Sequence, residues 1–170
     1  MTGKGHTQCG FAFSVFPIMV SYQNVGAIPA ALAMITCVLG ATAPDWLEIR
    51  VTKNGESRTL IPHRTITHII ALWTLLAIYA YCSVKGIDTP YYDLPLIEHG
   101  SVAASLFGFA CGGLVHLLGD IPNKQKIPIF TTYDGIAFNL WKSGKNEGLL
   151  VALTSFIAMA LMLWELEILW

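Results

Sequence analysis

His116 and Asp120 stand four residues apart in "VHLLGDIPNK", where a long apolar run gives way to polar sequence. On a continuous helix this spacing places both side chains on one face, about one turn apart, so that they can bind one metal ion together. Neutral imidazole and carboxylate are borderline ligands that suit zinc, manganese or iron. The alternative is an ordinary helix end, with Gly119 ending the helix and Asp120 in solvent.

Three more histidines and an aspartate occupy comparable positions. His6 precedes the first apolar stretch, Asp45 follows the second in "ATAPDWLE", and His63 and His68 precede the third in "PHRTITH". Each has a plain explanation by itself: "PHRTITH" is also typical of a basic interfacial turn, and Asp45 of a solvated cap. Ionisable groups gathered near a bilayer are costly, and they tend to be functional. Together they predict a metal site formed where several helix ends meet.

His63 and His68 are five residues apart, which is the wrong spacing for one face of a helix. Pro62 places His63 in a loop, and Thr65 or Thr67 could cap a helix that His68 opens. A loop ligand and a first-turn ligand can then meet at one ion.

The composition indicates a membrane protein. The chain has 170 residues, of which 54% are hydrophobic and 12% charged, and its mean hydropathy is +0.57. Those values lie outside the usual soluble range. The net charge is −1, so no basic excess points to nucleic acid and we expect no direct binding to it. We expect residues 1–170 to form a single integral-membrane domain.

Five apolar stretches alternate with polar segments, at about residues 10–22, 25–43, 69–84, 102–118 and 149–164. A helical crossing needs about 20 mainly apolar residues. The second and fifth stretches meet this need well, while the first is short and contains Pro17, which predicts a tilted, kinked or only partly inserted helix. Gly108 and Gly112 have a spacing that suits close helix packing. The predicted fold is an all-α polytopic membrane helix bundle of about five membrane-embedded helices, or four if the first is re-entrant.

Lys and Arg are distributed unevenly around these stretches. If all five cross, the N-terminus and residues 42–68 and 119–148 share one side, which holds nine of the ten basic residues: Lys4, Arg50, Lys53, Arg58, Arg64, Lys124, Lys126, Lys142 and Lys145. The positive-inside rule predicts a bacterial-type inner (cytoplasmic) membrane protein with its N-terminus and metal site in the cytoplasm and its C-terminus outside. The basic loops "NKQK" and "WKSGKNEG" either contact anionic head groups or only set this topology.

The segments "KGHTQCGFAF", "GATAPDWLEI", "IPHRTITHII" and "GGLVHLLGDI" together resemble the YdjM family of membrane-bound metal-dependent hydrolases. That family is grouped with zinc-dependent phospholipases C and single-strand-specific zinc nucleases, which are helical enzymes whose clustered metals are bound by His and Asp. The resemblance runs from about His6 to Trp141. It implies that the polar positions of the family correspond here to His6, Asp45, His63, His68, His116 and Asp120.

The chain departs from the family pattern at two places. The acidic turn of the family usually reads Pro-Asp-x-Asp, whereas here Leu47 takes the second acidic position and Glu48 follows it. Downstream, "FTTYDGIAFNLWK" has Lys142 where the family tends to have proline. The resemblance therefore supports the metal ligands more firmly than the residues that would contact the substrate.

A metal held by His and Asp activates water and polarises a phosphoryl oxygen, so the sequence predicts a metal-dependent hydrolase of a phosphoester on a lipid or lipid-linked substrate. The metal ligands would hold one or two divalent ions, with zinc preferred and manganese or iron as alternatives. The predicted catalytic residues are Asp45, as a metal bridge or general base, Glu48, as a substitute acid, and Arg64, which either meets a phosphate or snorkels at the interface.

The sequence leaves one rival function open and disfavours another. A non-catalytic, metal-stabilised membrane scaffold or partner-binding protein would use the same ligands with a closed shell. A metal or proton carrier is disfavoured, because the apolar stretches contain almost no ionisable residues for a pathway. The expected partners are the lipid bilayer and the substrate lipid, with a homo-oligomer or a membrane partner left open.

Overall fold

The chain begins with two helices joined end to end, α1 (Gly3–Phe13) and α2 (Val15–Val25). The structure is a computed structural model that describes residues 1–48, 50–53, 56–59, 64–87, 97 and 100–166. Pro17 has no N–H to donate to the carbonyl of Phe13, so the helix breaks at Ser14. The kink predicted from Pro17 is confirmed, and the helical rod begins before the apolar stretch does.

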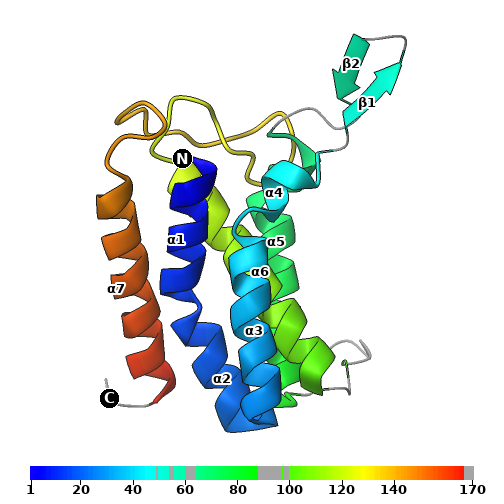
Figure 1. Ribbon diagram of the computed structural model, residues 1–170, viewed down its shortest axis with the longest axis vertical. Coiled ribbons are helices and arrows are strands. Elements are labelled where there is room, and N and C mark those ends of the chain that lie inside the picture. The colour runs from blue at the N-terminus through cyan, green and yellow to red at the C-terminus, as the bar shows by residue number, and fades with distance from the viewer. Residues whose placement is uncertain (49, 54–55, 60–63, 88–96, 98–99, 167–170) are drawn as a thin grey trace.

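The other long helices pass back and forth beside this rod. They are α3 (Ala27–Gly40), α5 (Ile70–Lys85), α6 (Gly100–Asp120) and α7 (Glu147–Glu165). Successive passes alternate in direction (Figure 1), so the N-terminus, the described parts of residues 42–69 and residues 121–146 lie at one end of the bundle. We call this end the N-terminal end. The three segments that the sequence placed together therefore do meet, whereas the side of a membrane that they face stays a prediction.

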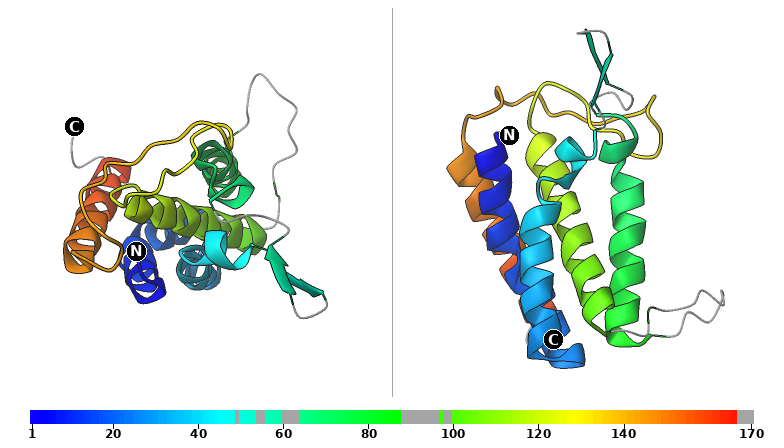
Figure 2. Two further views of the ribbon diagram at one scale, coloured as in Figure 1. Left: turned by 90° about the horizontal axis from the view of Figure 1, so that it is seen from above. Right: turned by 45° about the vertical axis from the view of Figure 1, so that its right-hand side comes forward.

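Short elements cross the N-terminal end. They are α4 (Ala43–Trp46), the strands β1 (Arg50–Lys53) and β2 (Glu56–Thr59), and the 3-10 helix η1 (Ile66–His68). The two strands pair antiparallel and project away from the helices (Figure 2). The bundle confirms the predicted all-α class, and the hairpin was not predicted. The Asn-Gly pair between the strands in the sequence is a strong hairpin signal that could have revealed it.

Helix α5 begins differently from the prediction. It starts at Ile70, one residue beyond η1, so His68 does not open it. Neither Thr65 nor Thr67 caps a helix with its side chain: the first two amides of α5 donate to the carbonyl oxygens of residues 128 and 129, at 3.0 and 2.9 Å. The predicted threonine cap is wrong because the loop after α6 supplies backbone acceptors that the local sequence cannot reveal.

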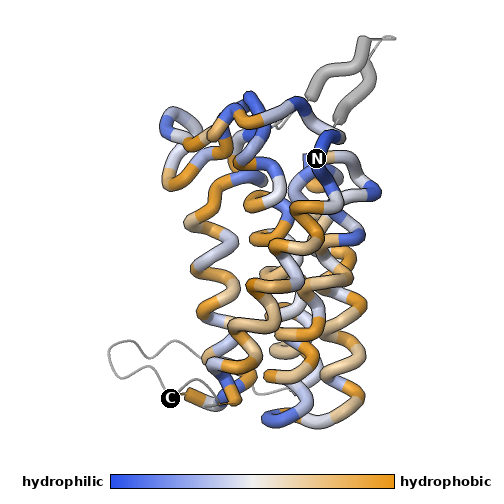
Figure 3. The backbone as a smooth tube through the Cα atoms, turned by 90° about the vertical axis from the view of Figure 1, so that its left-hand side faces the viewer, coloured by the Kyte–Doolittle hydropathy of each residue, from blue (hydrophilic) through white to orange (hydrophobic). Residues whose placement is uncertain are grey.

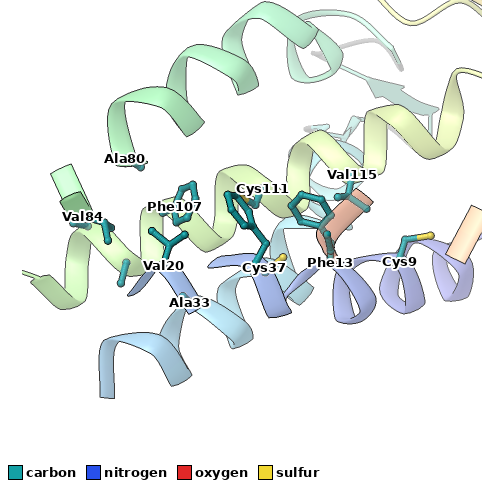
Figure 4. Packing of buried hydrophobic residues seen from close by; sticks show 14 of the residues in the cluster. Cys9, Phe13, Val20, Ala33, Cys37, Ala80, Val84, Phe107, Cys111 and Val115 are labelled. Carbon is teal, nitrogen blue, oxygen red and sulfur yellow. The ribbon is translucent and has the colours of Figure 1, made fainter. Parts of the chain in front are cut away.

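Small residues bring α3 and α6 together at the centre of the bundle. Gly108 faces the carbonyl oxygen of Ala33, and Gly112 faces that of Cys37, so a Cβ at either glycine would collide with the α3 backbone. Ala33 and Cys37 are fully buried and belong to the central apolar cluster (Figure 4). The close packing predicted from the glycine spacing is confirmed.

The outer surface of the bundle is apolar. Only Leu150 and Ala158 of α7 are buried, and apolar side chains such as Phe156, 71% exposed, point outward. The tube coloured by hydropathy shows the same apolar band on the other helices (Figure 3). A helix with a thin buried stripe and an apolar outer face is suited to surrounding lipid rather than water.

Two helices, α6 and α7, are long and apolar enough by themselves to cross a membrane. Helices α3 and α5 are apolar but shorter. The prediction of about five membrane-embedded helices is thus supported for two helices and stays a prediction for the rest.

Candidate metal centre

His116 and Asp120 both lie on the last turns of α6, and both are buried. Gly119 remains inside the helix, so the structure does not have the alternative arrangement of an ended helix with a solvated aspartate. The Nδ1 atom of His116 lies 2.9 Å from the carbonyl oxygen of Ala41, just beyond α3. This carbonyl accepts the Nδ1 proton, which leaves the Nε2 lone pair directed at the cluster.

His6, on the second turn of α1, lies against His116. The two buried rings stack with centroids 3.7 Å apart and an interplanar angle of 13°. His6 Nε2 is 3.4 Å from Asp120 Oδ1. The Nδ1 of His6 and the Nε2 of His116 are buried, and neither makes a hydrogen bond within the described part of the chain. Buried polar atoms without partners are costly, so these two nitrogens mark a place where a ligand would be stabilising.

Asp45 joins two of the histidines. Its Oδ1 lies 3.5 Å from the Nε2 of His116 and 3.5 Å from the Nε2 of His68. Its side chain is 45% exposed, so it forms the accessible wall of the cluster. Burial works to raise the pKa of the Asp45 carboxyl, but the hydrogen bond with His68 and the nearby His116 and His6 outweigh burial and hold this pKa below its ordinary value.

Glu48, predicted as a substitute acid, reaches the same cluster from the segment after α4. Its carboxylate is buried and lies 3.7 Å from His68 Nδ1. It also accepts a hydrogen bond from the backbone N–H of Arg64, at 3.3 Å, a residue whose φ of 60° is in the left-handed region. Glu48 therefore both belongs to the cluster and fixes the turn that delivers Arg64.

The guanidinium of Arg64 is directed into the bundle. It donates to Asp120 Oδ2 at 2.7 Å and to the carbonyl oxygen of Gln125 at 2.7 Å. The N-terminal ammonium group of Met1 and the side-chain amide of Asn123 also donate to Asp120. Sequence reasoning did not find the roles of Asn123 and Ala41. Nothing in a single sequence marks a backbone carbonyl, although Asn123 could have been suspected from its place three residues after Asp120.

Five of the six predicted metal ligands meet in this cluster: His6, Asp45, His68, His116 and Asp120. The sixth, His63, lies outside the described residues. His6, Asp45 and His116 offer donor atoms within 4.8 Å of one another, as do two further triplets that add His68, Asp120 and Glu48. We call the residues of the three triplets the His–Asp cluster: His6, Asp45, Glu48, His68, His116 and Asp120.

The His–Asp cluster fits a divalent metal by geometry and chemistry. Donor atoms that share a tetrahedral zinc ion at about 2.1 Å lie about 3.4 Å apart. The distances of 3.5 Å from Asp45 to two histidine nitrogens and of 3.4 Å from His6 to Asp120 match that separation. The three triplets overlap, which is compatible with one ion or with two that share ligands.

Comparison with known proteins identifies a family. The sequence model of a family described as YdjM inner membrane protein matches residues 1–168, nearly the whole chain. No curated protein matches the chain significantly, and neither does any solved structure.

Proposed function

The chain belongs to the YdjM inner membrane protein family, and on this premise we propose that it is a membrane-embedded, metal-dependent hydrolase of a phosphoester on a lipid or lipid-linked substrate. The observation that carries the proposal is the pair of buried, unsatisfied imidazole nitrogens of His6 and His116 beside the half-exposed carboxylate of Asp45. Ligands that face one another with one accessible side are what a catalytic rather than a purely structural metal needs.

A divalent metal bound here would lower the pKa of a water molecule and polarise a phosphoryl oxygen. Neighbouring residues of the chain orient the histidines of the cluster. His116 is held in one tautomer by the carbonyl of Ala41, and Glu48 and the Thr67 hydroxyl lie beside Nδ1 of His68. Asp45 is the group on the accessible wall, where it can bridge metals or take a proton from water.

Arg64 acts mainly as a positioning residue in this proposal. Its guanidinium balances the buried charge of Asp120 and ties the loop after α6 to the cluster through Gln125. A planar guanidinium is also a group that binds phosphate oxygens. The cluster would lie on the cytoplasmic side of an inner membrane, because the basic residues gather at the N-terminal end.

The first test is the metal content of the purified protein, measured by inorganic mass spectrometry in parallel with phosphate release from lipids in mixed micelles. We expect about one or two equivalents of zinc, manganese or iron, and loss of both metal and turnover in His116→Gln. Asp45→Asn should fold and lose turnover.

A matched control is Glu165→Gln at the opposite end of the bundle. Glu165 is also a buried carboxylate, paired with Lys85 and Tyr81, so its replacement should weaken folding without removing metal. A parent protein that binds no metal after each ion is added back would refute the proposal. Bound metal without turnover on any phosphoester, and unfolding of His116→Gln, would instead establish the non-catalytic scaffold.

A further inference from the structure

Helix α7 stands apart from α6 and buries only two of its side chains. It packs against α1 and α2, the view from above places it beside α1 (Figure 2), and at its last turn Glu165 pairs with Lys85 and Tyr81 of α5. Between α6 and α7 lies an apolar cavity of about 200 Å³. Its walls include Val115, Leu118 and Gly119 of α6 and Leu150, Leu153 and Ile157 of α7.

This cavity has a neighbouring cavity with which it shares one wall residue. Phe13 lines it and also lines a second apolar cavity of about 280 Å³, which extends to Leu161 and Trp164. Most walls of the second cavity come from α5 and α6, so we call only the first cavity, between α6 and α7, the α6–α7 crevice. Its walls are almost wholly apolar, and α7 exposes apolar side chains to its surroundings, so the available occupant of matching chemistry is a hydrocarbon chain.

The upper end of the crevice meets the His–Asp cluster at Gly119. A Cβ at this position would have the flexible Met1 side chain as its nearest neighbour and would lie 3.8 Å from Cε1 of His6. Gly119 also immediately precedes Asp120. The absence of a side chain at Gly119 thus leaves the crevice next to the ring of a candidate metal ligand.

A basic cavity lies on the other side of the segment 120–123. It has a volume of about 280 Å³ and is lined by Arg64, Asn123, Lys124, Gln125, Lys142 and Ser143. We call it the basic hollow. Pro122 lines the crevice and the next residue, Asn123, lines the basic hollow. One short segment therefore separates an apolar site from a cationic site, with Asp120 at its start.

From this arrangement we propose that the two cavities bind one anionic lipid, with an acyl chain in the α6–α7 crevice and the phosphate in the basic hollow. The lipid would straddle residues 120–123 and present its phosphoester to the His–Asp cluster. The proposal rests on the proposed function and names its substrate class: a phospholipid that is bound from within the membrane, rather than a soluble phosphoester. The cations of the hollow and the apolar crevice match the two chemical halves of such a molecule.

The test uses the whole protein in nanodiscs with a phosphatidic acid that carries a photoreactive diazirine on one acyl chain. A diacylglycerol with the same labelled chain is the probe without phosphate. After illumination, mass spectrometry locates the cross-linked residues. We expect phosphatidic acid to label the walls of the crevice on α6 and α7, and diacylglycerol to label them far less.

The variant Leu153→Trp should fill the crevice and remove most of this labelling. Leu149→Trp is its matched control, since Leu149 is equally exposed, 52% against 48%, lies one turn away and does not line the crevice. Ile157→Trp repeats the test if Leu153→Trp fails to fold. Lys124→Ala and Lys142→Ala should each weaken phosphatidic acid labelling about fivefold, which corresponds to about 1 kcal/mol for each basic residue near the surface.

Labelling spread evenly over the outer faces of α3 and α5, or unchanged in Leu153→Trp and Ile157→Trp, would overturn the proposal. Cross-linking of the crevice to a second copy of the chain would overturn it too. Metal content is measured in the same samples. If the His–Asp cluster binds metal but the crevice is not cross-linked to lipid, this inference alone is refuted. If lipid is cross-linked in the crevice but no metal is bound, the hydrolase proposal is refuted.

Discussion

Replacing Gly112 by alanine tests whether the contact between α3 and α6 sets the geometry of the metal site. A Cβ at Gly112 would lie 2.1 Å from the carbonyl oxygen of Cys37 and 2.6 Å from the backbone nitrogen of Ala41. An ordinary contact is about 3.5 Å, so α3 must retreat by at least about 1 Å. Overpacking of this kind costs about 1–3 kcal/mol of unfolding free energy.

The retreat of α3 would also reach His116. The bond from its Nδ1 to the carbonyl oxygen of Ala41 is 2.9 Å long, and lengthening it by about 1 Å takes it beyond hydrogen-bond range. The ring then loses the partner that fixes its tautomer and orientation. Loss of such an outer partner lowers metal affinity by about 10- to 100-fold.

Thermal unfolding in one detergent, followed by tryptophan fluorescence, and metal titration measure the two effects. Gly148→Ala is the control, because Gly148 lies in the first turns of α7 and a Cβ there meets nothing within 4 Å. This control should be neutral or stabilising by up to about 1 kcal/mol. If Gly112→Ala matches Gly148→Ala in stability and metal affinity, the proposed link between helix packing and the site is refuted.

Three further predictions follow from single contacts. The carboxyl of Asp45 has a pKa in the folded protein below its unfolded value of about 3.9. Its contribution to stability is therefore complete above that pH and is lost as the pH falls through the folded pKa. Between pH 6 and pH 3 the melting temperature should fall less steeply for Asp45→Asn than for the parent. Arg64→Ala removes one of the two charged partners of Asp120 and should lower the unfolding free energy by about 1–3 kcal/mol. Arg64→Lys should restore it only in part, because one ammonium cannot reproduce the fork to Asp120 and Gln125. Full rescue in a denaturant titration would contradict this. The Asp134 carboxylate accepts hydrogen bonds from the amides of Ile129, Phe130 and Thr131. Asp134→Ala should therefore speed hydrogen exchange at those amides and leave exchange in α6 unchanged. Protection that survives the substitution would show that other contacts hold the loop.

The membrane class and the gathering of polar residues at one end could be predicted from the sequence. Apolar stretches and the polar residues between them are one-dimensional properties, and alternating passes place every second connection at the same end. Pro17 marked the kink, and Gly108 and Gly112 marked the close contact with α3, because each of these residues constrains the backbone directly.

The threonine cap was predicted wrongly, and the hairpin was not predicted. The first amides of α5 are satisfied by residues 128 and 129, almost sixty positions along the chain, and hydropathy carries no information about such a partner. The hairpin was missed for a different reason: its Asn-Gly signal is present in the sequence but lies inside a polar connection where no strands were sought.

Sequence alone thus determined which residues are available as ligands and that their helix ends share one end of the bundle. Tertiary structure decided how they meet: His6 stacks on His116, Asp45 faces two histidines, and Arg64 turns inward to Asp120. It also decided that α7 stands off from α6 and leaves a crevice beside the site. These features depend on the rotation of each helix about its axis and on its distance from its neighbours, which are fixed by side-chain packing between segments far apart in the chain.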